Sequence, residues 1–354
     1  MPCLTPANKR ILHVIPDTVL QPRHAYLGST KVVRCLTSYF LERGLPFDEV
    51  VVPGRSDAAL LSKLRETQLD SYDAIVIEYP VYPRSMRFIR NKYPQAKLIV
   101  RSHNAEFYHW MDYAKSVLRQ LKVLKAFKYS LTSFKRLWLD YVCARYSDYV
   151  LSITPWEKEH YWTRLSRHSR IVNVPYYVTD SFVDSAEAVR EKENLCVCMM
   201  STVPGPLLYD AAKNLSKLVS ALNGDCGQWK FTGTGDTSSW PITLPSRITM
   251  TGFLDNPLGI LAKSRALALL SDYGYGFKTK ILDAILCRAY VLVTKRLYDR
   301  LPEEVRPFCI TVDMNSVDSF KDALSKCLLP YPEGNRNEDL RNEAFSALDS
   351  VLCG

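Results

Sequence analysis

Short apolar runs alternate with longer amphipathic stretches along the whole chain, and this repeat most constrains the fold. Each run is rich in Val, Ile, Leu and aromatic residues, and the spacing leaves room for a helix or a long loop after each one. The pattern is typical of parallel sheets whose strands are buried on both faces. The predicted strands are residues 10–15, 48–52, 73–79, 97–101, 149–153, 171–174, 195–201, 229–232, 248–251, 266–271, 290–294 and 309–312.

Twelve strands exceed one ordinary doubly wound sheet, whereas two such sheets fit a chain of 354 residues. The expected fold class is α/β, with two Rossmann-like domains that face each other across a cleft. We place the N-terminal domain at residues 1–175 and the C-terminal domain at 176–337, because the acidic stretch 180–193 has few large apolar residues. A last helix at 338–354 is expected to pack back on the N-terminal domain.

The composition disfavours several other classes of protein. The apolar share of 47% and the charged share of 23% are ordinary for globular chains. No run of 18 apolar residues occurs, and the first residues lack the long apolar core of a secretory signal. The ten cysteines do not show the paired spacing of zinc sites. We therefore expect a cytoplasmic protein with reduced thiols and no metal.

The net charge of +9 is unevenly distributed along the sequence. Residues 1–175 hold 27 Lys and Arg against 15 Asp and Glu, whereas the remaining residues hold 19 against 22. The basic half is expected to meet something anionic, such as a membrane surface, a phosphorylated substrate or a nucleic acid. No zinc finger, RNA-recognition signature or basic zipper occurs, so we expect no nucleic-acid partner.

Candidate site residues follow the predicted strands, because ligands of open parallel sheets bind beyond the carboxyl ends of the strands. His103, Asn104 and Glu106 come just after the strand at 97–101. Three polar groups together favour a functional site over a single buried histidine. Glycines follow other predicted strands, at Gly28, Gly205, Gly233 and Gly235. Gly28 fits a plain helix cap as well as it fits an anion-facing loop, and Gly233 and Gly235 alone resemble many ordinary turns.

The segment 274–283 is the most informative part of the sequence. Two glycines, of which Gly276 is the second, precede a predicted helix, so backbone amides and the positive end of the helix dipole can approach a phosphate. Lys278 and Lys280 lie near the helix start, where cations are unfavourable unless an anion offsets them. These features indicate a diphosphate site, with Asp283 placed one turn further on for ribose hydroxyls. A glycine-rich turn with solvated lysines is the alternative.

Five segments together give the chain a resemblance to the GT-B-fold, family-4-type (group 1) retaining glycosyltransferases. The resemblance covers most of the chain and is strongest in its second half. Residues 248–255 look like the family's TGFxxD turn, and residues 274–284 are similar to its GxGxKxKxLEA block, which binds the nucleotide diphosphate. Residues 290–294 stand at the family's PVV strand, residues 103–106 resemble its HNxE motif, and residues 146–154 resemble its aDxvixxS strand.

The resemblance implies a role for each matching residue. The implied catalytic residues are His103, Glu106 and Lys278, and the implied donor-binding residues are Gly28, Gly205, Gly233, Gly235, Gly276, Phe277, Lys278 and Asp283. Among them, Asp283 would hold the ribose, Lys278 would contact the diphosphate and His103 would face the sugar. Glu106 would orient its loop or contact substrate. The first acid of the family's usual pair falls at Tyr275 here, which cannot act as a carboxylate.

The expected function is the transfer of a sugar from a nucleotide-diphosphate donor to a glycan or lipid-linked acceptor, with no cofactor besides this co-substrate. The donor is expected on the C-terminal domain and the acceptor on the basic N-terminal domain. The resemblance implies retention of anomeric configuration, and Lys278 would stabilise the leaving diphosphate in place of a metal. Two alternatives stay open: a sugar-nucleotide epimerase of the same architecture, and a degenerate transferase that only binds a sugar nucleotide.

Residues 115–138 form a basic amphipathic stretch with seven Lys or Arg and no acid. Its apolar residues recur at helical spacing, so one long helix is predicted. They are Val117, Leu121, Leu124, Leu131, Phe134 and Trp138. Such a helix either lies in an anionic membrane interface or packs its apolar stripe on the domain core with lysines in solvent. We expect peripheral, salt-sensitive association with an anionic membrane surface.

Overall fold

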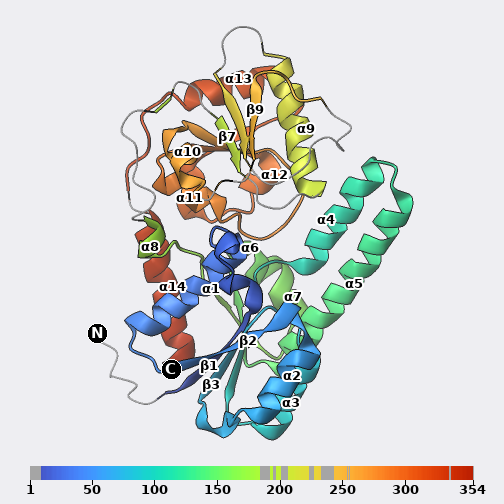
Figure 1. Cartoon of the computed structure of the whole chain (residues 1–354), viewed down its shortest axis with the longest axis vertical. Helices are drawn as coiled ribbons and strands as arrows, with labels where there is room; N and C mark the ends of the chain where they lie inside the picture. The colour runs from blue at the N-terminus through green and yellow to red at the C-terminus, as the bar shows by residue number, and fades with distance from the viewer. Residues whose placement is uncertain are drawn as a thin grey trace.

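The computed structural model describes residues 9–183, 192–193, 197–200, 206–222, 227–232, 243–252, 254, 256–334 and 336–353. Within them the chain forms two six-stranded parallel sheets, one from each half of the sequence, which follow one another along the long axis of the molecule (Figure 1). Each predicted strand overlaps one observed strand. The predicted α/β class with two Rossmann-like domains is therefore confirmed.

The first sheet has the strand order β2-β1-β3-β4-β5-β6. Its strands are β1 (Ile11–Pro16), β2 (Phe47–Val52), β3 (Ala74–Glu78), β4 (Lys97–Arg101), β5 (Tyr149–Ser152) and β6 (Arg170–Asn173). Its helices include α1 (Gly28–Glu42), α2 (Asp57–Glu66) and α3 (Pro83–Lys92). Ile11 of β1 packs in one cluster with Leu36 of α1, whereas its neighbour Leu12 packs in another with Leu60 of α2. Because both faces are buried in this way, the strands read as continuous apolar runs.

The second sheet has the strand order β12-β11-β10-β7-β8-β9. Its strands are β7 (Val197–Met200), β8 (Trp229–Thr232), β9 (Ile248–Gly252), β10 (Ala266–Leu269), β11 (Tyr290–Thr294) and β12 (Cys309–Val312). Its helices are α9 (Pro206–Ser220), α10 (Leu258–Lys263), α11 (Lys280–Leu286), α12 (Lys295–Tyr298) and α13 (Val317–Lys326). Short helical elements complete the described chain: η1 (Asp17–Leu20), η2 (Pro22–His24), η3 (Pro53–Arg55), η4 (Leu69–Ser71), α6 (Pro155–Glu157), η5 (Lys158–Trp162), α7 (Thr163–Leu165), α8 (Asp180–Val183) and η8 (Glu303–Phe308).

The last helix, α14 (Arg336–Leu352), runs beside the first sheet although it follows the second one in the sequence (Figure 1). Asp349 accepts hydrogen bonds from the Tyr39 hydroxyl (2.9 Å) and the Arg43 guanidinium (2.7 Å) of the α1 region. The Lys97 ammonium donates to the carbonyl of Val351 (2.6 Å). These polar contacts, together with its buried apolar face, tie the end of the chain to the N-terminal half.

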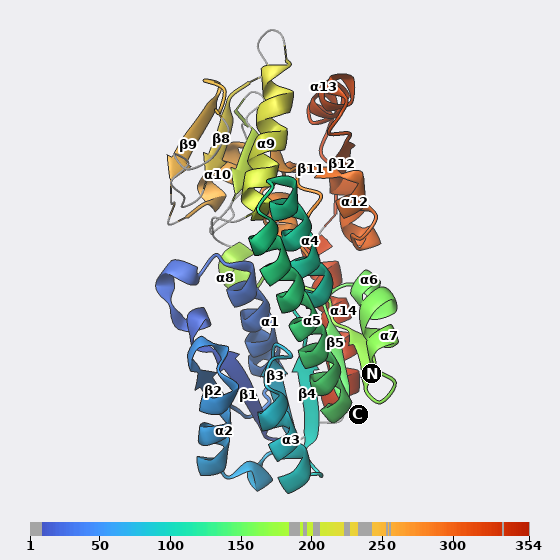
Figure 2. The same cartoon turned by 90° about the vertical axis from the view of Figure 1, so that its right-hand side faces the viewer.

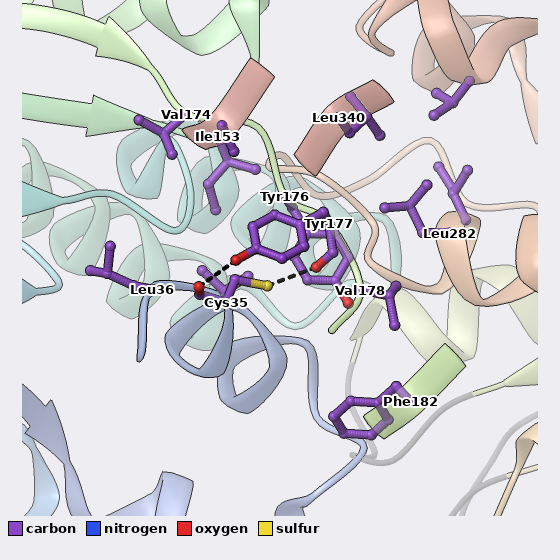
Figure 3. Packing of buried hydrophobic residues seen from close by; sticks show 14 of the residues in the cluster. Cys35, Leu36, Ile153, Val174, Tyr176, Tyr177, Val178, Phe182, Leu282 and Leu340 are labelled. Atoms are coloured by element: carbon purple, nitrogen blue, oxygen red, sulfur yellow. Dashed lines mark hydrogen bonds between the residues drawn. The ribbon is translucent and has the colours of Figure 1, made fainter. Parts of the chain in front are cut away.

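Residues from both halves share one hydrophobic cluster around the connection at 174–178 (Figure 3). The Tyr177 hydroxyl donates to the carbonyl of Cys35 (2.6 Å), and the Cys35 thiol donates to the carbonyl of Tyr177 (2.7 Å). Leu282 of α11 and Leu340 of α14 belong to the same cluster. The two sheets are therefore joined by a continuous apolar core as well as by a covalent connection.

The basic stretch is not one helix, which corrects the prediction for residues 115–138. It forms a hairpin of α4 (Glu106–Arg119) and α5 (Val123–Tyr146), which lie side by side in both views (Figures 1 and 2). Leu121 turns the chain with a left-handed backbone (φ +59°). Glycine or asparagine usually marks such a turn. Because a leucine occupies it and the apolar spacing continues across it, the sequence reads as uninterrupted helix.

Candidate functional site

A cavity of about 460 Å³ opens between the two sheets, where the carboxyl ends of strands from both domains meet. Five of the predicted site residues line it: Gly28, His103, Glu106, Phe277 and Lys278. Gly28 follows β1, the two residues of the HNxE-like motif follow β4, and the other two follow β10. The fold therefore brings together residues that are up to 250 positions apart, as expected for a ligand site at strand ends.

His103 is held by a buried carboxylate. Its Nε2 lies 2.5 Å from Oε2 of Glu78, the last residue of β3, which has no exposed surface. Burial alone would raise the pKa of Glu78, but the charge and hydrogen bond of His103, the hydrogen bond of His13 and the charge of Arg101 hold it below its usual range. Burial lowers the pKa of His103 despite the opposing charge of Glu78. A neutral ring that donates from Nε2 to Glu78 leaves its Nδ1 as an acceptor, and this atom has no partner among the described residues.

His103 also belongs to a stacked column that the sequence did not reveal. Its ring stacks on Tyr79 with 3.8 Å between ring centroids, and the Arg55 guanidinium covers the same tyrosine at 3.7 Å. Tyr79 and Arg55 both have left-handed backbones, with φ of +74° and +56°. Strained residues of this kind cluster at functional sites. Both side chains line the cavity, so this column forms part of its N-terminal wall.

Glu106 begins α4, where the positive end of the helix dipole favours a carboxylate. Its Oε2 accepts a hydrogen bond from the Trp110 indole (3.0 Å), and the Arg136 Nε lies 3.9 Å away on α5. Glu157 holds the loop between β4 and α4, because its Oε1 accepts a hydrogen bond from the Ala105 amide at 3.0 Å. Burial raises the pKa of Glu157 to about 7. Glu157 thus anchors the loop after β4, while Glu106 is held at the start of the helix that follows.

Lys278 supplies positive charge to the C-terminal wall. Burial, together with the charges of Arg300 and Lys280, lowers the pKa of Lys278 to about 8. The Lys278 ammonium has a hydrogen bond to the carbonyl of Tyr275 at 3.2 Å. Burial and the charge of Lys278 lower the pKa of His109, across the cavity on α4, to about 3. Several cations thus share a desolvated region, and an anion bound there would offset their repulsion.

Two predicted donor-binding glycines lie where the domains approach most closely. A Cβ on Gly276 would lie 2.8 Å from Asn104 Oδ1 and 3.2 Å from the carbonyl oxygen of His103. Gly276 also has a left-handed backbone (φ +82°). A Cβ on Gly28 would lie 2.6 Å from Oγ1 of Thr279. Both positions therefore require a residue without a side chain, because backbone from one domain meets side chains of the other.

Tyr275, at the position of the family's first acid, faces the N-terminal domain. Its ring stacks on Tyr108 of α4 with 5.1 Å between centroids, and its hydroxyl accepts from Arg296 at 2.9 Å. Asp112 of α4, which is almost fully buried, accepts from the same guanidinium (3.2 Å) and from the Gly274 amide (3.0 Å). The tyrosine thus takes part in an interdomain contact, and the nearby carboxylate comes from the other domain.

Asp283, the predicted ribose residue, is engaged elsewhere. Both of its carboxylate oxygens lie 2.7 Å from the Lys31 ammonium of α1, and both side chains are almost fully buried. Asp283 does not line the cavity. Contact with a ribose would require this interdomain ion pair to open, so the ribose role stays a prediction.

Some predicted features cannot be placed. Gly205, Gly233 and Gly235 lie outside the described residues. No group of three or more His, Cys, Asp and Glu that could hold a metal ion occurs in the part of the chain that the structure describes. Glu78 and Tyr79 were missed because they fall inside the predicted strand 73–79, and Arg55 was missed because it is a single arginine in the loop after the predicted strand 48–52. A glutamate that closes an otherwise apolar strand is the signal that could have found the first of them.

No family model and no curated protein matches the sequence. Solved structures match it in fold. Sucrose-phosphate synthase from Thermosynechococcus elongatus has a TM-score of 0.62 and 13% identity, and the match covers 97% of this chain and 95% of that one. HepE from Anabaena, solved with UDP, has a TM-score of 0.56 and 10% identity over 97% and 96%. A glycosyltransferase from Rickettsia africae has a TM-score of 0.58 and 12% identity over 98% and 96%.

These similarities extend over nearly the whole chain and define its architecture. The protein has two Rossmann-like domains in the GT-B arrangement of these glycosyltransferases. No described helix is long and apolar enough to cross a membrane.

Proposed function

We propose that this protein is a glycosyltransferase that moves a sugar from a nucleotide-diphosphate donor to an acceptor. The observation that carries the proposal is the interdomain cavity, which is lined by Lys278 from one domain and by His103 and Glu106 from the other. The fold supports it, because the similar Anabaena HepE has been solved with UDP and with UDP-glucose. A nucleotide sugar would span the cavity, with its diphosphate toward the cationic wall and its sugar toward His103.

The proposed sugar transfer depends on the positive charge that lines the cavity. Cleavage of the donor leaves negative charge on the diphosphate, and a desolvated Lys278 would stabilise that charge more strongly than it stabilises the ground state. His103 Nδ1, as a neutral acceptor, would take a hydrogen bond from a sugar hydroxyl and orient the ring for transfer. We propose transfer with retention of configuration, with no metal and no cofactor besides the donor. Glu106 would contact the acceptor or fix the loop that carries His103.

The test is calorimetric binding of UDP, GDP and ADP, followed by turnover of the corresponding sugar nucleotides. Saturation with a tight ligand at a hundredfold excess over its Kd raises the apparent free energy of unfolding by about 2.7 kcal/mol, which a thermal shift detects. Release of nucleoside diphosphate that depends on acceptor supports transfer. Interconversion of the sugar without acceptor indicates an epimerase instead.

Lys278→Met is expected to weaken binding of the nucleoside diphosphate by about tenfold to a hundredfold, because one charge-assisted contact is lost. The matched control is Lys326→Met, which removes an exposed cation from α13. Affinity for the diphosphate that is equal in the two variants, measured by calorimetry, would remove Lys278 from the donor site.

A second candidate is a protein that binds a sugar nucleotide without transferring the sugar. The pairing of Asp283 with Lys31 and the tyrosine at position 275 favour it, because neither family carboxylate is free to contact the donor. Donor binding without nucleoside diphosphate release, with a broad set of glycan and lipid-linked acceptors, would support this candidate.

For the proposed transfer, we favour a lipid-linked acceptor over a free glycan. The reason is the basic α4–α5 hairpin, which carries seven Lys and Arg within residues 115–138 and no acid between 113 and 139.

A further inference from the structure

An apolar stripe lies exposed along α5. Its members recur every three or four residues, which places them on one side of the helix. They are Leu124, Phe127, Leu131, Phe134, Trp138 and Tyr141. Leu124 is 88% exposed, Phe127 is 64% exposed and Trp138 is 56% exposed. The opposite side of α5, which includes Ala126, Ser133 and Cys143, is buried. The stripe therefore lies on the solvent side of α5, outside the buried interface of the hairpin.

The exposed apolar surface continues around the tip of the hairpin. Leu118 at the end of α4, Leu121 in the turn and Val123 at the start of α5 are all more than half exposed, and Leu121 reaches 86%. Figure 1 shows that α4 and α5 form one arm that projects from the side of the first domain, and α4 also contacts α9 of the second domain. Contiguous exposed apolar surface of this kind marks interaction sites.

Cations border the stripe. Lys128 is four residues after Leu124 and three before Leu131, and Lys135 is four residues after Leu131 and three before Trp138, so both lie along one edge. Further cations surround the tip, at Lys115, Arg119, Lys122 and Lys125. No acid occurs between Asp112 and Asp140. We infer that the α4–α5 hairpin docks this protein on an anionic lipid bilayer, with the stripe and tip in the interface and the lysines at lipid headgroups.

The charge pattern selects this occupant over a second copy of the chain. Two stripes packed against each other would bring Lys128 and Lys135 of both copies together, and the hairpin has no exposed acid between 113 and 139 to pair with them. A bilayer surface supplies both an apolar interior for the aromatic and leucine side chains and anionic headgroups for the ammonium groups. α5 lies in the interface plane in this arrangement, since it is not apolar enough to span the bilayer.

The docking surface and the cavity share one element. Glu106, His109 and Tyr113 of α4 line the cavity, while the end of the same helix carries Leu118 of the docking tip. Docking would hold the cavity close to the lipid surface, where an acceptor anchored in the membrane can reach it. The docking itself does not depend on the proposed transfer, whereas the membrane-anchored acceptor does.

Co-sedimentation with phosphatidylcholine vesicles that contain phosphatidylglycerol, compared with pure phosphatidylcholine vesicles, tests the inference. The protein should pellet with the anionic vesicles at low salt and should be released as salt increases. The charge variant Lys122→Glu/Lys125→Glu/Lys128→Glu should bind more than about a hundredfold more weakly. Its control, Lys63→Glu/Arg65→Glu/Lys92→Glu, changes net charge equally on exposed positions of α2 and α3 and should bind as the parent does.

The apolar variant Leu124→Ser/Phe127→Ser/Leu131→Ser should also lose binding, while Leu20→Ser/Leu41→Ser/Leu329→Ser, at exposed leucines elsewhere, should keep it. Circular dichroism on each variant, and calorimetry with whichever of UDP, GDP and ADP the parent binds, establish that the fold and the donor site are intact. Vesicle binding equal in apolar variant and parent, or a parent that stays in the supernatant, overturns the inference. So does a stripe-dependent dimer in sedimentation velocity without vesicle binding. Failure of the parent to bind any of UDP, GDP and ADP would contradict the proposed transfer and leave the docking result standing.

Discussion

At the scale of single residues, the site depends on a few buried charges whose partners lie on other strands. His103 is the clearest case, because its hydrogen-bond partner Glu78 lies on the adjacent strand of the sheet and 25 positions earlier in the sequence. Glu78 also accepts from Nε2 of His13 on β1 at 3.1 Å. One carboxylate of β3 thus orders the side chains of two histidines, one on β1 and one just after β4, and this sets the orientation of the His103 imidazole toward the cavity.

Glu78→Gln is expected to lower kcat by about tenfold while the Kd for UDP stays close to that of the parent, because the change loosens His103 and not the cationic wall. His13→Gln is the matched control, since it removes the other histidine on Glu78 and keeps the bond to His103. A variant whose kcat and KM match the parent's would show that Glu78 has no positioning role.

Glu157 predicts a pH dependence. Its pKa is raised from 4.5 to about 7 in the folded state, so the folded protein holds the proton more tightly than the unfolded chain does. The resulting stability is fully present below pH 4.5 and is lost as the pH rises through about 7. Its full size is about 3 kcal/mol, from 1.36 kcal/mol per pKa unit. Glu157→Gln keeps an acceptor for the Ala105 amide and removes the titration.

Urea unfolding at several pH values between 4.5 and 8 measures this effect. The parent should lose free energy of unfolding across this window more steeply than Glu157→Gln does. Parallel curves for the two proteins would contradict the raised pKa.

At the scale of elements, the loop from β10 to α11 is shaped by its contact with the other domain. Gly276→Ala adds a methyl group against Asn104 and the carbonyl of His103 at a left-handed backbone position. Gly44→Ala is the matched control, because Gly44 has a similar φ (+62°) and open space around it. The control should cost about 1–2 kcal/mol for the backbone alone. Gly276→Ala should cost roughly 1–3 kcal/mol more for the clash, and it should also weaken UDP binding.

Chemical denaturation of both glycine variants, with UDP calorimetry, checks this prediction. Equal losses in the free energy of unfolding would mean that the loop and Asn104 do not approach each other as closely in solution.

At the scale of the whole molecule, the two domains are held together by polar contacts that cross the cleft. The pair Lys31–Asp283 is almost fully buried, whereas Lys295–Asp299 is an exposed pair within one helical turn. Lys31→Met should cost about 3–5 kcal/mol, since it leaves a buried carboxylate unpaired. Lys295→Met should cost about 1 kcal/mol or less. Lys31→Met/Asp283→Leu should recover most of the loss.

Thermal and urea unfolding of these variants test the buried pair. A double mutant no more stable than Lys31→Met would contradict the predicted cost of an unpaired carboxylate.

Asp283→Ala separates the structural role of Asp283 from its predicted role in binding the ribose. A loss of UDP affinity beyond the loss of stability would support contact with the ribose. Unchanged UDP affinity would leave Asp283 with a structural role alone.

The residue pattern alone predicted the twelve strands, their division between two sheets and the placement of His103, Glu106 and Lys278 after strands. Each of these depends on local pattern, because a strand buried on both faces must be apolar throughout and a ligand site lies where such strands stop. Residues such as Gly276 could be singled out for the same reason, although the need for a glycine there comes from the other domain.

The interaction partners of the site residues, by contrast, depend on how distant segments pack. Lys31 and Asp283 are 252 positions apart, and no local spacing relates them. Glu78 reads as the end of a strand until the sheet order places it beside His103. The turn at Leu121 and the exposure of the α5 stripe likewise depend on which face of α5 packs on α4. Apolar periodicity predicts that a helix has two faces, but whether the apolar one meets the core or solvent is decided by the packing of distant elements.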